Sequence, residues 1–359
     1  MQHLYLHIGT NKTATSLIQA ACRHQRGLLQ QSGIDYPATG LGQSPNGSVS
    51  VGHHDLAAAI SPSQVRNFRA SQSIESLRDA LLRETAHYPK VLLSSETLSY
   101  IGHRDMPRLR VLLDAFPKVT VIAYIRRQDS FALSGYNQKI KSAYNQNKFP
   151  KSLPNFEPYC KKTKMDFYRK MRFWDQHGGN AELVVRPFVE TAWKEGNILA
   201  DLFAIIDPDM APPRSDKAQR NESWPLAAIH ILQRLDAMDI PHKDRRELAR
   251  VIRQVAERFS VRPDEGFLTP DIQRYLLERY RKSNRLLATR FWTREETHLF
   301  EEQEVKTYPK SYSGITAGEY AEIIAAVWKN GIPVSESRIS SAVGHNPARP
   351  EWEGSMWRL

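Results

Sequence analysis

The sequence predicts an α/β protein whose central parallel sheet is flanked by helices and whose C-terminal half is mostly helical. Three observations predict this class. Short apolar, β-branched runs such as 119–125 have the composition of strands that are buried on both faces. These runs alternate with longer stretches of helical periodicity, as in a parallel sheet covered on both faces. From about residue 194 onward the helical pattern continues without further strands.

Five apolar runs are predicted to form the strands of this sheet. In chain order they are 3–8, 34–36, 91–95, 119–125 and 182–186. Helices are predicted where apolar residues recur at the spacing of one helix face. These stretches are 14–31, 54–60, 73–87, 106–115, 129–146, 163–177, 195–206, 224–238, 243–259, 269–290 and 316–330. Two long polar segments, 38–52 and 145–158, are predicted as loops that either bind an acceptor or simply connect elements at the surface.

Composition bounds the class of protein. The chain has 359 residues and a formal net charge of +11, which favours acidic partners. It has no zinc-ligand spacing, RNA-binding aromatic signature or basic zipper, so no nucleic-acid partner is expected. No apolar run reaches the length of a membrane span, and the N-terminus lacks a signal peptide's apolar core. The only cysteines, Cys22 and Cys160, are expected to be free, buried thiols, and a cytoplasmic location is predicted.

The segment from Gly9 to Ser16 is predicted to bind an anion. It joins an apolar strand to a helix, and the first N–H groups of a helix have no partner within it, so they can donate to phosphate or sulfate. Lys12 adds a full positive charge, and the Thr and Ser hydroxyls add donors. The spacing differs from the usual phosphate loop, which has four residues between its first Gly and a Gly-Lys-Ser/Thr triplet. The alternative is a plain strand and helix with an exposed lysine.

A second anion site is predicted where the strand 119–125 ends. Arg126 follows that strand directly, at the edge where open α/β sheets bind ligands. Ser134 lies eight residues further along the chain, about two turns into the next helix. An Arg guanidinium and a Ser hydroxyl at this spacing can converge on one phosphate.

These two motifs together resemble a known family, the sulfotransferases that use 3′-phosphoadenosine 5′-phosphosulfate (PAPS). Lys12-Thr13-Ala14-Thr15-Ser16 is similar to their 5′-phosphosulfate loop, and Arg126 through Ser134 is similar to their 3′-phosphate motif. The chain departs from the family at Ala14, where a Gly is usual. A methyl group there would crowd the approach of the backbone to the sulfate.

The resemblance implies a fold, a co-substrate and a set of binding residues. The fold would be that of sulfotransferases related to P-loop nucleotide hydrolases, with a sulfotransferase domain over residues 1–330 and a C-terminal extension over 331–359. PAPS would be the co-substrate, with no metal. Its binding residues would be Asn11, Lys12, Thr13, Ala14, Thr15, Ser16, Arg126 and Ser134.

Two residues are predicted to be catalytic, Lys12 and Glu96. Negative charge grows on the bridging oxygen as the phosphosulfate breaks, and Lys12 would stabilise it. Glu96 follows the strand 91–95 at the same edge and would take the proton of an acceptor hydroxyl, as a Glu does in the glycan-modifying members of the family. His53 and His54 are the alternative bases. Arg186 ends the last strand, where it either contacts ligand or, as we favour, forms a structural ion pair.

The sequence therefore predicts a sulfotransferase that acts on a hydroxyl-bearing acceptor, an acidic or neutral glycan. Two other functions stay open. The first is a P-loop phosphotransferase that uses a nucleoside triphosphate, against which the short loop and the lack of a magnesium-binding aspartate count. The second is a non-catalytic protein that binds acidic polymers through its basic surface, with strongly salt-dependent affinity.

Overall fold

A computed structural model describes residues 1–42, 49–63, 70–145, 155–214, 223–235, 242–260 and 262–332. The chain divides into two compact units. Unit 1 comprises Met1–Gly135, Lys162–Glu222 and Pro270–Thr307, and unit 2 comprises Tyr136–Lys161, Ser223–Thr269 and Tyr308–Leu359. The predicted extension 331–359 lies outside the described residues except for Gly331 and Ile332. The predicted domain limits stay a prediction.

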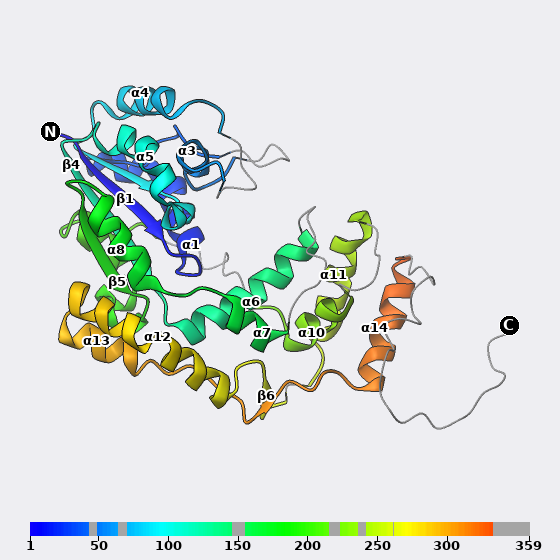
Figure 1. Cartoon of the computed structure of the whole chain (residues 1–359). Coiled ribbons are helices and arrows are strands. Elements are labelled where there is room, and N and C mark those ends of the chain that lie inside the picture. Colours follow the sequence, from blue (N-terminus) through cyan, green and yellow to red (C-terminus); the bar gives the residue numbers. More distant parts are fainter. Residues whose placement is uncertain are drawn as a thin grey trace, which may run out of the picture. The chain divides into compact units, whose positions relative to one another are not determined.

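Unit 1 is built around a five-stranded sheet in which all neighbours run parallel (Figure 1). The strand order is β2-β3-β1-β4-β5. Their bounds are β1 His3–Gly9, β2 Ile34–Asp35, β3 Lys90–Ser94, β4 Lys118–Ile125 and β5 Glu182–Pro187. The three central strands β3, β1 and β4 are nearly continuous buried apolar runs, as expected when helices cover both faces. The predicted α/β class with a central parallel sheet is confirmed.

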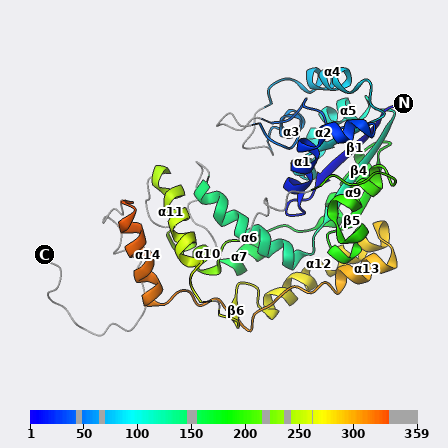
Figure 2. The ribbon, with the colours of Figure 1, turned by 180° about the vertical axis from the view of Figure 1, so that it is seen from behind.

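Three helices pack on one face of this sheet, and Figure 2 shows them in front of it. They are α1 Thr15–His24, α2 Arg26–Gln31 and α9 Ile198–Ile206. Their apolar residues bury Tyr5, Leu92, Ile122 and Tyr124 of the strands. Side chains alternate between the two faces of a strand, so Leu4, Leu6 and their neighbours point to the opposite face.

The remaining helices of unit 1 include α3 His54–Ile60, α4 Ile74–Thr85, α5 Met106–Leu113, α8 Phe167–His177, α12 Pro270–Phe291 and α13 Arg294–Glu301. Short 3-10 helices are η1 Glu96–Tyr100, η2 His103–Asp105, η3 Glu190–Ala192 and η4 Lys194–Gly196. Helix α6, Gln128–Asn145, begins directly after β4, and its residues up to Gly135 belong to unit 1.

Unit 2 is mainly helical. Besides the rest of α6 it contains α7 Phe156–Lys162, of which only Lys162 belongs to unit 1, with α10 Leu226–Leu235, α11 His242–Ala256, α14 Ala317–Lys329 and the short parallel pair β6 Glu265–Gly266 and β7 Lys310–Ser311. Aromatic packing fills its centre. The buried Tyr136 ring lies 5.2 Å from that of Phe156 and 5.3 Å from that of Phe267, both in edge-on geometry.

Several predicted elements differ from the structure. The predicted helix 14–31 is two helices that meet at Gln25, whose φ of −109° leaves the helical region. Part of the predicted loop 145–158 is wrong, because α7 begins at Phe156; the stretch 146–154 lies outside the described residues. Helix α13 was not predicted, although Thr293 and Glu296 form a capping box at its start.

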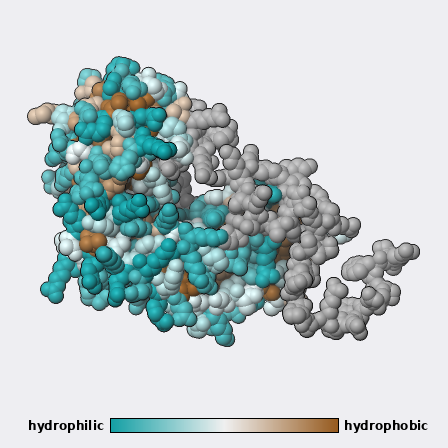
Figure 3. Space-filling view, in the orientation of Figure 1, coloured by the Kyte–Doolittle hydropathy of each residue, from teal (hydrophilic) through white to brown (hydrophobic). Residues whose placement is uncertain are grey.

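The described surface in Figure 3 is mostly hydrophilic, with isolated apolar side chains. Among the described residues, no helix combines the length and the apolar composition needed to cross a membrane. Cys22 and Cys160 are free and buried, as predicted. Burial raises the pKa of both thiols, that of Cys160 to about 12, so neither is a reactive thiolate at neutral pH.

Candidate functional site

The turn between β1 and α1 has an irregular backbone that is fixed by hydrogen bonds. Gly9, Lys12 and Ala14 all have positive φ, at 78°, 67° and 57°. The Thr10 N–H and hydroxyl both donate to the Tyr124 carbonyl, at 3.0 and 3.1 Å. The Thr13 hydroxyl donates to the Thr10 carbonyl. The Thr13 hydroxyl was predicted to donate to a ligand. In the structure Thr13 is buried, and this hydroxyl bonds within the loop.

Helix α1 begins at Thr15 and has no acidic residue in its first turn and no side-chain cap. Its first turn is closed by the Leu17 and Ile18 N–H groups, which both donate to the Ala14 carbonyl. Within the described residues, the N–H groups of Thr15 and Ser16 have no acceptor. Ser16 is exposed and Thr15 is buried. Unpaired N–H groups and the helix dipole make this end of α1 suited to an anion.

Lys12 and Arg126 lie side by side, because β1 and β4 are neighbours in the sheet. The Arg126 Nη1 donates to the Lys12 carbonyl at 3.0 Å. Burial lowers the pKa of both side chains, and the nearby Arg126 lowers that of Lys12 further. A pair of neighbouring, partly buried cations, one of which lowers the pKa of the other, is an arrangement that an anion would stabilise.

Arg126 is held in place by a residue that sequence reasoning missed. Its Nε donates to Ser130 Oγ at 2.6 Å, and its guanidinium lies 5.5 Å from the Phe188 ring centre. Within the described residues its Nη2 has no partner. The predicted ligand Ser134 is half-buried on α6, one turn beyond Ser130 and on the same helix face. The four-residue spacing of Arg126, Ser130 and Ser134 is the signal that was available.

Glu96 lies directly against the end of β1. A Cβ at Gly9 would come within 2.9 Å of the Glu96 Cβ and 3.2 Å of its Cα, so only glycine permits this approach. The Gln19 Nε2, from the buried face of α1, donates to Glu96 Oε2 at 3.0 Å and to Ser94 Oγ at 3.2 Å. Gln19 was not predicted, because nothing in the spacing marks it. The structure thus places Glu96 beside the predicted anion loop.

The two alternative bases have different surroundings. His53 is buried, its Nδ1 accepts from the Ser94 N–H at 3.0 Å, and its Nε2 donates to the Pro37 carbonyl at 3.1 Å. Burial lowers its pKa to about 3, so His53 is a neutral structural residue with both ring nitrogens used. His54 Nδ1 lies 3.0 Å from Ser95 Oγ. Burial lowers the pKa of His54, and the charge of Glu96 opposes this shift only in part, so His54 remains the alternative base to Glu96.

The predicted ligand Asn11 is turned toward a neighbouring element instead. Its Nδ2 donates to the Tyr100 hydroxyl at 3.1 Å, which ties the loop to the end of η1. The Asn11 side chain therefore helps to position the loop. Its role as a ligand-binding residue stays a prediction.

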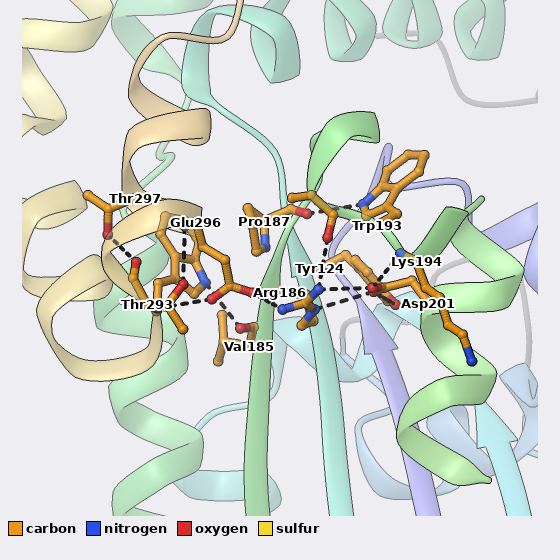
Figure 4. Close-up of polar contacts among 12 residues, drawn as sticks. Tyr124, Val185, Arg186, Pro187, Trp193, Lys194, Asp201, Thr293, Glu296 and Thr297 are labelled. Carbon is orange, nitrogen blue, oxygen red and sulfur yellow. Dashed lines mark hydrogen bonds and ion pairs between the residues drawn. The ribbon is translucent and has the colours of Figure 1, made fainter. Parts of the chain in front are cut away.

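Arg186 forms a structural ion-pair network, as favoured from the sequence (Figure 4). Its Nη2 lies 2.9 Å from Asp201 Oδ1, and its Nη1 pairs with Glu296. Tyr124 donates its hydroxyl to Asp201 Oδ2 at 2.7 Å. Arg186 also donates to the Ala192 carbonyl at 2.9 Å. The network joins strands β4 and β5 to helices α9 and α13.

We expect Ala14→Gly to stabilise the protein slightly, by up to about 1 kcal/mol. An alanine in the left-handed region costs ~1–2 kcal/mol, and the extra freedom of glycine in the unfolded chain returns ~0.5–1 kcal/mol of that. The check is the free energy of unfolding in urea. Ala20→Gly in the same helix is the control, and it should destabilise by about 1 kcal/mol. Equal losses in both variants would contradict the assigned strain.

Comparisons with known proteins assign no activity. No family model matches the chain. A protein of Archaeoglobus fulgidus that carries the description "Uncharacterized protein" is 24% identical to the chain over 225 residues, which cover 61% of this chain and 58% of the archaeal protein. The match therefore spans less than two thirds of either chain. Function has to be argued from the geometry of the site.

Proposed function

We propose that this chain is a sulfotransferase that moves a sulfuryl group from PAPS to a hydroxyl group of a saccharide, with a sulfotransferase-type P-loop fold. The observation that carries the proposal is the hydrogen bond from Arg126 to the Lys12 carbonyl at 3.0 Å. Two anion-binding motifs, read from stretches more than a hundred residues apart, meet at one edge of the sheet. One nucleotide with a 5′-phosphosulfate and a 3′-phosphate needs two such anion sites close together.

The residues of the site divide the work between the two anionic ends of the co-substrate. PAPS supplies an activated sulfuryl group. The N–H groups at the start of α1 would hold its non-bridging oxygens, together with the Ser16 hydroxyl. Lys12 would stabilise the charge that grows on the bridging oxygen when the sulfur–oxygen bond breaks. Arg126, oriented by Ser130, would bind the 3′-phosphate with Ser134.

Glu96 is the base of the proposal. The acceptor oxygen forms the new bond to sulfur, and the proton of the acceptor hydroxyl goes to the Glu96 carboxylate. The bond from Gln19 to Oε2 fixes the carboxyl group and leaves Oε1 for that proton. The acceptor, an acidic or neutral glycan, would reach the site from the side of η1.

The test is a thermal-shift comparison without metal, using adenosine 3′,5′-bisphosphate and ADP. A ligand that binds only the native state raises its stability, by about 2.7 kcal/mol at a hundred times its Kd. We expect stabilisation by the 3′,5′-bisphosphate and little by ADP. Preference for ADP, or activity that EDTA abolishes, would favour the phosphotransferase alternative. Binding to anionic polymers with no preference for a 3′-phosphate would favour the non-catalytic one.

We expect Arg126→Ala to weaken binding of adenosine 3′,5′-bisphosphate roughly 10- to 100-fold, the worth of a charge-assisted hydrogen bond to phosphate. The affinity for adenosine 5′-phosphosulfate, which has no 3′-phosphate, should change much less. Titration calorimetry with both nucleotides measures the difference. Equal losses for the two ligands would show that Arg126 does not bind a 3′-phosphate.

A further inference from the structure

Lys170 lies in the first turn of α8 in unit 1, with its ammonium group over an aromatic ring. Its Nζ is 3.8 Å from the ring centre of Tyr100 and 5.8 Å from that of Phe167. A cation over the face of an aromatic ring is attracted by the ring's negative face. Within the described residues, no carboxylate pairs with Lys170 and no hydrogen bond involves its ammonium group.

Such a lysine is costly for the fold. Burial lowers its pKa to about 8, because the charged form has lost much of its water. An apolar side chain of the same length would fill the space without that penalty. A bound anion would stabilise the charged form of such a desolvated lysine, which has no carboxylate partner among the described residues.

The position of Lys170 relative to Glu96 indicates which anion that is. Tyr100 ends the same 3-10 helix that Glu96 begins, so the two residues are about 8 Å apart along its axis. The Tyr100 hydroxyl accepts from Asn11 of the anion loop at 3.1 Å. Lys170 therefore contacts the far end of the 3-10 helix that Glu96 begins, whereas Lys12 and Arg126 would serve the anions of the nucleotide. A saccharide whose hydroxyl lies at Glu96 and whose chain runs along this 3-10 helix would bring a neighbouring group to Lys170.

We propose that Lys170, supported by the Tyr100 ring, binds an anionic group of the acceptor, and that the acceptor is an acidic saccharide with a carboxylate or sulfate near the reacting hydroxyl. This inference rests on the proposed function, because it takes Glu96 as the place where the acceptor binds. The net charge of +11 agrees with an acidic partner.

The experiment measures binding of matched saccharides to the full chain saturated with adenosine 3′,5′-bisphosphate. The probes are hexasaccharides of unsulfated chondroitin, hyaluronan and heparosan. Each hexasaccharide is prepared in three forms. The first keeps its carboxylates, the second has them reduced to alcohols and is neutral, and the third is the reduced form with sulfate groups added. We expect at least one backbone to bind roughly 10-fold or more tightly in an anionic form than in the neutral form. The carboxylated and sulfated arms show which anion is preferred. No preference on any backbone would overturn the proposal.

Lys170→Met tests the residue itself, because methionine keeps the length and removes the charge. The anionic preference should fall to within about 2-fold, with the neutral saccharide unaffected. Lys118→Met, at the exposed amino end of β4 on the opposite edge of the sheet, is the control and should keep the preference. A preference that survives in Lys170→Met would overturn the assignment.

Thermal unfolding separates a binding role from a structural one. Lys170→Met should unfold at the same temperature as the wild type or higher, since a desolvated charge is removed. A lower unfolding temperature together with equal losses for neutral and anionic saccharides would mean that Lys170 only supports the fold. Failure of the proposed function gives a different result, because the wild type would then not bind adenosine 3′,5′-bisphosphate at all.

Discussion

Lys12→Ala should lower the rate of sulfuryl transfer roughly 10²–10³-fold, the usual loss when one preorganised transition-state donor is removed. The reason is geometric and electrostatic. Lys12 lies in the turn between β1 and α1 beside Arg126, where burial strengthens its interaction with a growing negative charge. The Arg126 bond goes to the backbone carbonyl of Lys12, so it remains in the variant.

The measurement is single-turnover formation of adenosine 3′,5′-bisphosphate from PAPS, with an unsulfated glycan mixture as acceptor. Affinity for the bisphosphate should change far less than the rate, since the charge develops only as the bond breaks. The φ of Lys12 is 67°, and alanine carries a β-carbon as lysine does, so the substitution adds no backbone strain. Lys118→Ala is the control for loss of positive charge. A Lys12→Ala rate within about 3-fold of the wild type would remove Lys12 from the chemistry.

The wild-type rate should also depend on pH through Lys12. Its pKa is lowered by burial and by Arg126, so its proton is lost at a lower pH than from a free lysine. With the acceptor at saturation, so that titration of Lys170 does not limit acceptor binding, kcat/KM for PAPS should therefore decline on the alkaline side beginning below the ordinary lysine pKa of 10.5. A pH–rate profile shows this limb, and Lys12→Ala should lack it. An identical alkaline limb in the variant would assign the titration to another group.

The strands and the two anion motifs were predictable because their signals are local. A buried parallel strand such as β4 is recognised in the sequence as an apolar, β-branched run. The polar residues that follow such a strand lie at the carboxyl edge of the sheet, where open α/β sheets bind ligands. The break between α1 and α2 was not predictable in this way, since Gln25 is neither Gly nor Pro. The start of α7 inside the predicted loop was not recognised, although Pro158 falls in the first turn of that helix, where proline is tolerated.

The supporting residues of the site depend on tertiary contacts. Three of these contacts join residues that are far apart in the sequence: Gln19 with Glu96, Asn11 with Tyr100, and Lys170 with Tyr100. The fourth joins Arg126 to Ser130, and its four-residue spacing is too common in helices to mark a site. Ala14 shows the limit from the other side. The sequence shows that Ala14 differs from the motif it resembles, which has a glycine there, but the positive φ of Ala14 is seen only in the structure.

Arg186→Met should lower the free energy of unfolding of unit 1 by about 3 kcal/mol, because it leaves two carboxylates without their cation. Asp201 is 5% exposed and Glu296 is 12% exposed, so water cannot replace the lost partner fully. The quarter of the Arg186 side chain that is exposed keeps the loss at the lower end of the range for a buried pair. Thermal unfolding should shift down by roughly 6–12 °C.

An exposed ion pair of the same unit provides the control. Arg274 and Asp271 are 76% and 86% exposed, and Arg274→Met should cost less than about 1 kcal/mol. Arg186→Met with Asp201→Asn should lose less than the sum of the single variants, since the second change removes an uncompensated charge. Folded Arg186→Met should bind adenosine 3′,5′-bisphosphate within about 3-fold of the wild type, because Arg186 is fully engaged by Asp201, Glu296 and the Ala192 carbonyl. Unchanged stability with a roughly 10-fold weaker nucleotide affinity would instead make Arg186 a ligand-binding residue, and the network in Figure 4 would then serve to aim it.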